Sequence, residues 1–146
     1  GRPSPDFTPA ATSGPDVTLS RLRGKNVLLA FFPLAFTSVC TKELSAFTED
    51  LSRFQNANTT VLPISVDSVP TLKEFKAKEK INIDLLSDFK REVSRLYGTL
   101  IEDKFFSNRA YVVIDRNGVV RWTFSEQTPG TRRENEELLA QLRALG

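Results

Sequence analysis

The chain has 146 residues, and its 20 basic and 18 acidic side chains give a formal net charge of +2. This near balance gives no sign of a nucleic-acid partner or of binding to an anionic membrane surface. With no histidine and one cysteine, the sequence excludes histidine-based catalysis, thiolate clusters and an intramolecular disulfide, and we expect no metal and no organic cofactor.

No apolar run approaches the roughly 20 residues that a membrane-spanning helix requires. Methionine is absent, even at position 1, which predicts a chain that has been processed or trimmed. A single thiol without a visible signal peptide is typical of a cytoplasmic protein.

The N-terminal part predicts short strands and then a buried one. Residues 6–8 and 17–19 resemble strands on either side of a turn near Gly14, so we expect an N-terminal β-hairpin. Residues 26–32 (NVLLAFF) form a continuous apolar run of strand length. Such a run favours a strand that is covered on both faces, as in a parallel or mixed sheet.

A helix is predicted from about Cys40 to about residue 55. The apolar positions 44, 47, 51 and 54 recur at spacings of three and four residues, which makes one apolar helix face. Cys40 lies four residues before the first of them, on that same face. We therefore expect its sulfur to point into the protein and not toward solvent.

The rest of the chain alternates between strand and helix patterns. Residues 60–66 form a second buried strand, which we expect to begin late or to be irregular because of Pro63. The remaining predicted elements are a helix capped by Ser68 or Asp67 and running to about Lys80, a strand at 85–86, a helix at 92–97 stopped by Gly98, strands at 110–115 and 119–124 around the Asn117-Gly118 turn, and a helix at 133–145. This order predicts an α/β fold with a mixed sheet, in a single domain over residues 1–146.

The setting of Cys40 favours a reactive thiol. A strand ends, a loop follows, and a helix begins with Thr37 or Ser38 as its cap, so that Cys40 falls in the first turn. Unpaired amides and the helix dipole at such a position lower cysteine pKa values from about 8.5 to roughly 3.5–7.5. The alternative is a buried, inert cysteine that packs as a small apolar side chain.

The pattern Pro33-xxx-Thr37-xx-Cys40 resembles the active-site signature of the peroxiredoxins, which are thiol peroxidases with a thioredoxin-like fold. The resemblance continues over nearly the whole chain, through residues 5–8, 27–33, 64–68, 86–88 and 108–118. The PLAFT segment and the Asn108-Arg109 hairpin are most similar to the one-cysteine, AhpE-like group, near the bacterioferritin-comigratory (Q) type.

The resemblance implies a role for five residues. Cys40 would be the nucleophile, Thr37 would hold peroxide and thiolate, and Pro33 would shield the sulfur. Arg109 would favour the thiolate and donate hydrogen bonds to peroxide oxygen, and Glu43 would be paired with an arginine. The alternatives are a plain helix cap for Thr37, a strand terminator for Pro33, a surface charge for Arg109 and an ordinary first-turn glutamate for Glu43.

The implied reaction is the reduction of hydrogen peroxide or an organic hydroperoxide through a cysteine sulfenic acid, as in antioxidant enzymes of cell redox homeostasis. In many Q-type relatives a resolving cysteine follows five residues after the first, and here that position is Ser45. The chain is therefore a natural one-cysteine enzyme, or one whose resolving cysteine has been replaced. In either case recycling needs an external thiol, such as thioredoxin or a glutaredoxin-like protein.

Two other readings stay open at this level: a peroxide-sensing thiol protein with little turnover, and a structural domain with an inert thiol. Because members of the family often dimerise, a homodimer is also an expectation.

Overall fold

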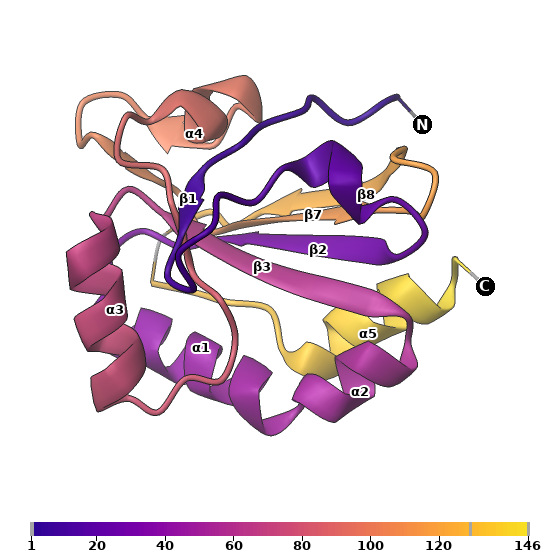
Figure 1. The fold of residues 1–146 in the computed structure, drawn as a ribbon, viewed down its shortest axis with the longest axis horizontal. Helices are drawn as coiled ribbons and strands as arrows, with labels where there is room; N and C mark the ends of the chain where they lie inside the picture. Colours follow the sequence, from indigo (N-terminus) through magenta and orange to yellow (C-terminus); the bar gives the residue numbers. More distant parts are fainter. Residues whose placement is uncertain (1, 129, 146) are drawn as a thin grey trace.

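A central mixed sheet carries the fold of the computed structural model, which describes residues 2–128 and 130–145 (Figure 1). Within these residues the sheet has six strands in the order β1-β4-β3-β2-β7-β8. They are β1 (Ala10–Ala11), β2 (Asn26–Phe31), β3 (Thr59–Ser65), β4 (Leu86–Ser87), β7 (Ala110–Ile114) and β8 (Val120–Ser125). The pairs β2–β3 and β3–β4 are parallel, and β2–β7, β7–β8 and β1–β4 are antiparallel. This confirms the predicted mixed sheet.

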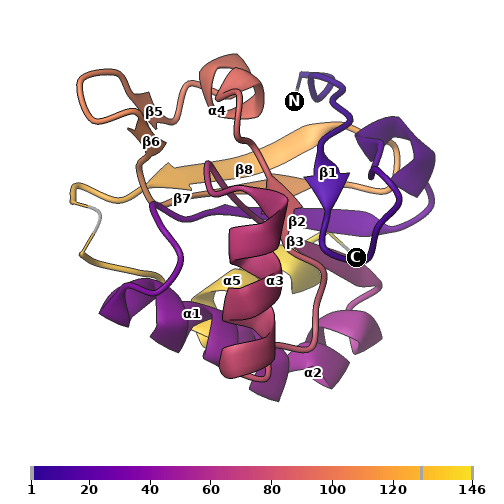
Figure 2. The same ribbon diagram turned by 60° about the vertical axis from the view of Figure 1, so that its left-hand side comes forward.

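Helices cover the two faces of the sheet unequally (Figures 1 and 2). One face carries α1 (Ser38–Glu49), α2 (Leu51–Asn56), α3 (Val69–Lys78) and α5 (Asn135–Arg143). The other carries the N-terminal segment with the 3-10 helix η1 (Leu19–Leu22) and the short helix α4 (Glu92–Leu96). A separate small hairpin, β5 (Leu100–Ile101) and β6 (Phe106–Ser107), lies near α4 and was not predicted.

The core consists of two apolar layers because side chains alternate between the faces of a strand. Leu28 and Ala30 of β2 face the helical layer, where Cys40 and Leu44 of α1 pack with them. Val27 and Leu29 face the other layer, formed with the N-terminal segment and α4. All six residues of β2 are buried, as expected for the continuous apolar run.

The predicted N-terminal hairpin is wrong. Residues 17–19 do donate across to residues 7–9, since the Val17 amide donates to the Pro9 carbonyl at 3.0 Å and the Leu19 amide to the Phe7 carbonyl at 3.1 Å. Neither segment is a strand in the described part of the chain; the strand β1 follows at Ala10 and pairs with β4 instead. Proline supplies no amide hydrogen, so Pro9 cannot continue a ladder between the two segments.

Pro63 does not disturb its strand, contrary to expectation. β3 begins at Thr59 and keeps a regular parallel register with β2, with Pro63 opposite Ala30. The next residue, Ile64, accepts from Phe32 on the β2 side, so the backbone of Pro63 faces the β4 side. Since β4 consists of Leu86–Ser87 alone, no ladder bond is lost where proline lacks its hydrogen.

The remaining predicted elements are present with small shifts in their bounds. The long helix is divided at Asp50 into α1 and α2. The side chain of Ser68 caps α3 by accepting from the Thr71 amide, with Pro70 in the first turn. Gly118, at φ 81°, provides the left-handed residue of the β7–β8 turn. Among the described residues, no helix is long and apolar enough to cross a membrane.

Candidate active site around Cys40

The topology brings Cys40 and Arg109 to the same edge of the sheet. α1 begins shortly after the carboxyl end of β2, and Cys40 is its third residue. β7 runs antiparallel to β2, with Ala110 opposite Phe31, so Arg109 lies beside the end of β2 from which the Cys40 loop leaves. Two residues that are distant in the sequence thus meet where the central strands end.

Arg109 contacts the sulfur directly. Its Nη2 lies 2.9 Å from Cys40 Sγ, and both residues are 1% exposed. A guanidinium is permanently charged and donates in a fixed plane, so this contact favours the anionic form of a thiol. The first amides of a helix lack partners within the helix, and the Cys40 side chain lies in that first turn.

Glu43 is paired, as expected for a carboxylate one turn away from the thiol. Its Oε1 lies 2.6 Å from Arg109 Nη1, and the residue is fully buried. Its second oxygen, Oε2, accepts a hydrogen bond from the hydroxyl of Tyr111. The carboxylate is therefore held by two donors in a place that solvent does not reach.

Burial and charge act against each other in this group. Burial raises the pKa of the Glu43 carboxyl, while the Arg109 charge and the Tyr111 hydroxyl act in the opposite direction. Burial by itself lowers the pKa of Arg109, but the nearby Glu43 and Cys40 outweigh it, and the net direction is upward. The guanidinium consequently stays charged next to the sulfur.

Thr37 occupies the N-cap position of α1, but its side chain does not cap the helix. The hydroxyl donates instead to the carbonyl of Leu34, at 2.7 Å, and the residue is exposed. The Thr37 carbonyl accepts from the Thr41 amide at 2.9 Å and so begins the helix. Pro33 is buried just after β2.

Ser45 lies in the middle of α1, where its side chain is half-buried. It belongs to the same rigid helix as Cys40. Residues five apart on a regular helix do not share a face, since one turn takes 3.6 residues.

Sequence reasoning missed three residues that organise this site. Asp67 follows β3, and its Oδ2 accepts from the Ala35 amide at 2.8 Å and from the Ser65 hydroxyl at 2.7 Å. It thereby ties the loop before Cys40 to the neighbouring strand. The other two, Tyr111 and Arg133, meet where the Arg133 amide donates to the Tyr111 hydroxyl at 3.0 Å.

A usable signal for Tyr111 was present in the sequence. Side chains two apart in an extended segment point to the same side. Tyr111 follows Arg109 by two residues, so a strand that turns Arg109 toward Cys40 also turns the tyrosine toward α1. No comparable local signal marks Arg133, which belongs to the segment before α5.

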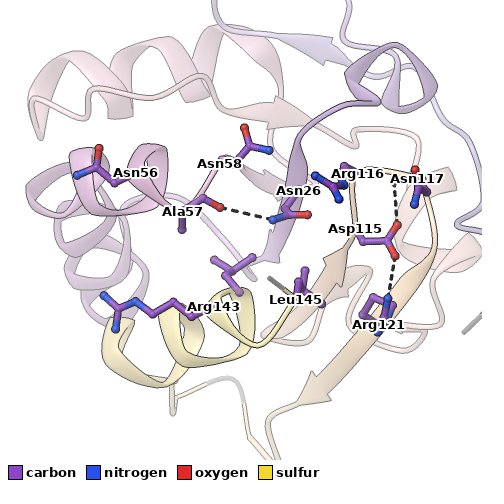
Figure 3. Close-up of a pocket in the computed structure, with 11 residues that line it drawn as sticks. Asn26, Asn56, Ala57, Asn58, Asp115, Arg116, Asn117, Arg121, Arg143 and Leu145 are labelled. Carbon is purple, nitrogen blue, oxygen red and sulfur yellow. Dashed lines mark hydrogen bonds and ion pairs between the residues drawn. The ribbon is translucent and has the colours of Figure 1, made fainter.

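A cavity of about 480 Å³ lies at the opposite end of the sheet, away from Cys40 (Figure 3). There Arg121 pairs with Asp115 at 3.1 Å, and Asn26 Nδ2 donates to the Ala57 carbonyl at 3.5 Å. Within residues 2–128 and 130–145, no group of three or more His, Cys, Asp and Glu side chains is arranged to hold a metal ion.

Comparison with known proteins gives one consistent family. The sequence profile of the AhpC/TSA family matches residues 1–123. Alkyl hydroperoxide reductase E of Mycobacterium tuberculosis is 41% identical over 137 residues, which cover 92% of this chain and 89% of that protein. Peroxiredoxin-2 of Bos taurus is 36% identical over 148 residues, which cover 94% of this chain and 74% of the relative.

Solved structures agree with this. The reduced 2-Cys peroxiredoxin of Plasmodium vivax superposes with a TM-score of 0.92 at 34% identity, covering 99% of this chain and 80% of the other. The thioredoxin-like arrangement expected from the sequence is thus confirmed by a structural neighbour. The chain belongs to the AhpC/TSA family, the family of the peroxiredoxin enzymes.

Proposed function

We propose that Cys40 is the peroxidatic nucleophile of a one-cysteine thiol peroxidase that reduces hydrogen peroxide and organic hydroperoxides. The observation that carries this proposal is the 2.9 Å contact between Arg109 Nη2 and Cys40 Sγ, in a place that solvent hardly reaches. Burying a charged guanidinium costs free energy. Its contact with the Cys40 sulfur is accounted for by a reactive thiol, whereas an inert buried cysteine requires no cation beside it.

The reaction follows from this arrangement. The Cys40 thiolate attacks one peroxide oxygen, the S–O bond forms, and the O–O bond breaks. Sulfur is oxidised by two electrons to sulfenic acid, and the departing oxygen takes a proton and leaves as water or an alcohol. Negative charge moves from sulfur to that oxygen, where donors already in position stabilise it.

Arg109 and Thr37 would supply these donors. The guanidinium already faces the sulfur through Nη2. The Thr37 hydroxyl, bonded to the Leu34 carbonyl before substrate arrives, would turn to the peroxide when it binds. Pro33 would shield the thiolate from water, which its burial after β2 supports.

The second half of the cycle needs a thiol from outside the chain, since the sequence holds one cysteine. The external thiol attacks the sulfenic acid, water leaves, and a mixed disulfide forms; a second thiol then releases reduced Cys40. Thioredoxin or a glutaredoxin-like protein would serve as donor in the reducing cytoplasm. Excess peroxide would carry Cys40 on to sulfinic acid.

We also propose a homodimer in solution. Three phenylalanines, Phe36, Phe89 and Phe105, are 48%, 60% and 61% exposed, which leaves apolar surface available for a second copy. Sedimentation at several protein concentrations tests this, and a monomer at every concentration would disprove it.

The decisive experiment is stopped-flow oxidation of the reduced protein by hydrogen peroxide, followed by Trp122 fluorescence and by loss of free thiol. We expect oxidation orders of magnitude faster than that of an ordinary thiol, one sulfenic acid per chain, and no reaction in Cys40→Ser. Ser45→Ala is the matched control on the same helix and should react like the wild type. A rate equal to that of a simple thiol would overturn the proposal.

Turnover separates the enzyme from a sensor. With thioredoxin, a glutaredoxin-like protein or a small thiol as donor, the enzyme consumes many equivalents of peroxide per chain. Fast oxidation without turnover by any of these donors would favour the sensing role instead.

A further inference from the structure

A buried tyrosine beside the active site has no part in the reaction described so far. We propose that Tyr111 is a positioning residue, whose hydroxyl holds Glu43 so that the Arg109 guanidinium stays turned toward Cys40. The inference rests on the proposed role of Cys40 and Arg109 and names the group that keeps those two residues aligned.

The contacts form a chain that ends at the sulfur. The Tyr111 hydroxyl donates to Glu43 Oε2. The other carboxylate oxygen, Oε1, lies 2.6 Å from Arg109 Nη1. Arg109 Nη2 in turn lies 2.9 Å from Cys40 Sγ. The two ends of the guanidinium are thus divided between the carboxylate and the sulfur.

This division depends on Tyr111 because of how arginine and carboxylate prefer to meet. The favoured geometry is a fork, with two parallel N–H···O bonds between guanidinium and carboxylate. Without the tyrosine hydroxyl, Glu43 Oε2 would lose a hydrogen-bond donor that water cannot replace, because Glu43 is 0% exposed. A second bond from Arg109 would restore a donor to Oε2 and would draw Nη2 away from the sulfur; Arg132 is the other cation that acts on the Glu43 carboxyl.

A second contact fixes the direction of the tyrosine hydrogen bond. The backbone amide of Arg133 donates to the Tyr111 oxygen at 3.0 Å, so the hydroxyl hydrogen is directed at Glu43. Arg133 is itself held by Glu126, at 2.8 Å from Nε, and the Glu126 amide donates to the carbonyl of Arg109 at 2.9 Å. The network closes on the active-site arginine.

Tyr97 offers a matched comparison. Its hydroxyl also donates to an internal acceptor, the carbonyl of Pro5, at 2.6 Å. It lies in the other core layer, against the rings of Phe7 and Phe31. Tyr111→Phe and Tyr97→Phe each delete one hydroxyl and the hydrogen bond that it donates. Tyr111→Phe also removes the acceptor of the Arg133 amide, and it alone alters the connection to Cys40.

The test measures the rate constant for oxidation by hydrogen peroxide between pH 5 and 9 for both variants, together with their melting temperatures. We expect Tyr111→Phe to react about tenfold more slowly at pH 7, which corresponds to about 1.4 kcal/mol. Its pH–rate profile should also differ from that of the wild type, because Arg109 Nη2 no longer keeps its contact with the sulfur. Tyr97→Phe should keep the wild-type rate and profile.

Each outcome decides the matter. Equal profiles in the two variants would overturn the role of Tyr111 while leaving the peroxidase intact. A wild type no faster than an ordinary thiol would overturn the proposed function and this inference with it. If Tyr111→Phe does not fold, 3-fluorotyrosine incorporated into Tyr97→Phe changes the acidity of the position 111 hydroxyl while keeping the ring; an unchanged pH–rate profile would again overturn the role.

Discussion

Two arginine–carboxylate pairs stand at opposite ends of β7, and their surroundings differ sharply. Arg109 and Glu43 lie 2.6 Å apart with both side chains 1% exposed. Arg121 and Asp115 lie 3.1 Å apart at the edge of the cavity in Figure 3, with side chains 50% and 11% exposed. The same two functional groups thus form a desolvated pair beside a thiol at one end, and at the other end a pair whose arginine is half exposed and whose carboxylate is largely buried.

The difference teaches what burial does to an ion pair. Removing one member of a buried pair leaves an uncompensated charge that water cannot reach, whereas water and salt already screen an exposed pair. The buried pair therefore holds the Arg109 guanidinium in place against the Cys40 sulfur. In the other pair Arg121 is half exposed and screened by solvent, while Asp115 is held by the amides of Asn117 and Val119.

The largest expected effect is on stability. Arg109→Ala leaves Glu43 buried without its cation and should lower the free energy of unfolding by about 3–5 kcal/mol. Arg121→Ala, at the other end, should cost less than about 1 kcal/mol. Urea unfolding followed by Trp122 fluorescence measures both. Equal losses would contradict the distinction between the two ends.

The oxidation rate of a conservative variant, Arg109→Lys, tests the same comparison between the two pairs. Arg109→Lys keeps a positive charge but loses the planar fork, so it cannot serve Glu43 and Cys40 in the same way. We expect oxidation by hydrogen peroxide to slow by about 100-fold, the lower end of what losing one transition-state donor costs. Arg121→Lys is the control and should react like the wild type; a comparable loss there would speak against a local effect.

Substitutions at Thr37 test the Cys40 end of the sheet and leave the Arg109–Glu43 ion pair unchanged. Thr37→Val removes the hydroxyl that now bonds the Leu34 carbonyl, and we expect oxidation to slow by about tenfold. Thr37→Ser retains a hydroxyl and should keep most of the rate. Stopped-flow measurement at saturating and subsaturating peroxide follows both variants. A valine variant as fast as wild type would restrict Thr37 to starting the helix.

The sequence predicted the parts of this site that are continuous along the chain. The β2 run, the loop and the first turn of α1 lie within residues 26–40, and local pattern placed Cys40 in the helical layer of the core. Arg109 is 69 positions from Cys40, so no local pattern joins the two, and its assignment came from the family resemblance. Tyr111 and Arg133 lie outside the signature: the position of Tyr111 two residues after Arg109 is a local signal, whereas Arg133 emerges from tertiary contacts alone.

The two predictions of secondary structure that were wrong, the N-terminal hairpin and the irregular strand at Pro63, have the same origin. The N-terminal segments at 6–8 and 17–19 have strand-like composition, yet β1 forms at Ala10–Ala11, where β4 offers an edge. The composition of the segment predicts an irregular strand at Pro63, yet the strand is regular because the short β4 does not extend to the position opposite the proline nitrogen. In both cases a neighbour that is remote in the sequence decided the local structure.

The smallest effect concerns pH, and the two carboxylates should respond in opposite directions. Burial acts to raise the pKa of Asp115, but the amides of Val119 and Asn117 and the Arg121 side chain outweigh it, so the pKa is lowered. A carboxyl whose pKa is lower in the folded state stabilises the fold above its unfolded pKa of about 3.9 and loses that contribution as pH falls. Asp115→Asn should therefore cost about 1 kcal/mol at pH 7 and progressively less toward pH 3.

Glu43 has the opposite sign because burial raises its pKa. Its contribution to stability is present in full below the unfolded pKa of about 4.3 and falls as pH rises through the folded value. In urea unfolding between pH 3 and 8, the advantage of wild type over Asp115→Asn should grow with pH, while that of wild type over Glu43→Gln should shrink. Both variants exchange one carboxyl for one amide, so opposing slopes of the unfolding free-energy difference against pH would reflect the different surroundings of the two carboxyls. Parallel slopes would contradict the difference between the two ends of β7.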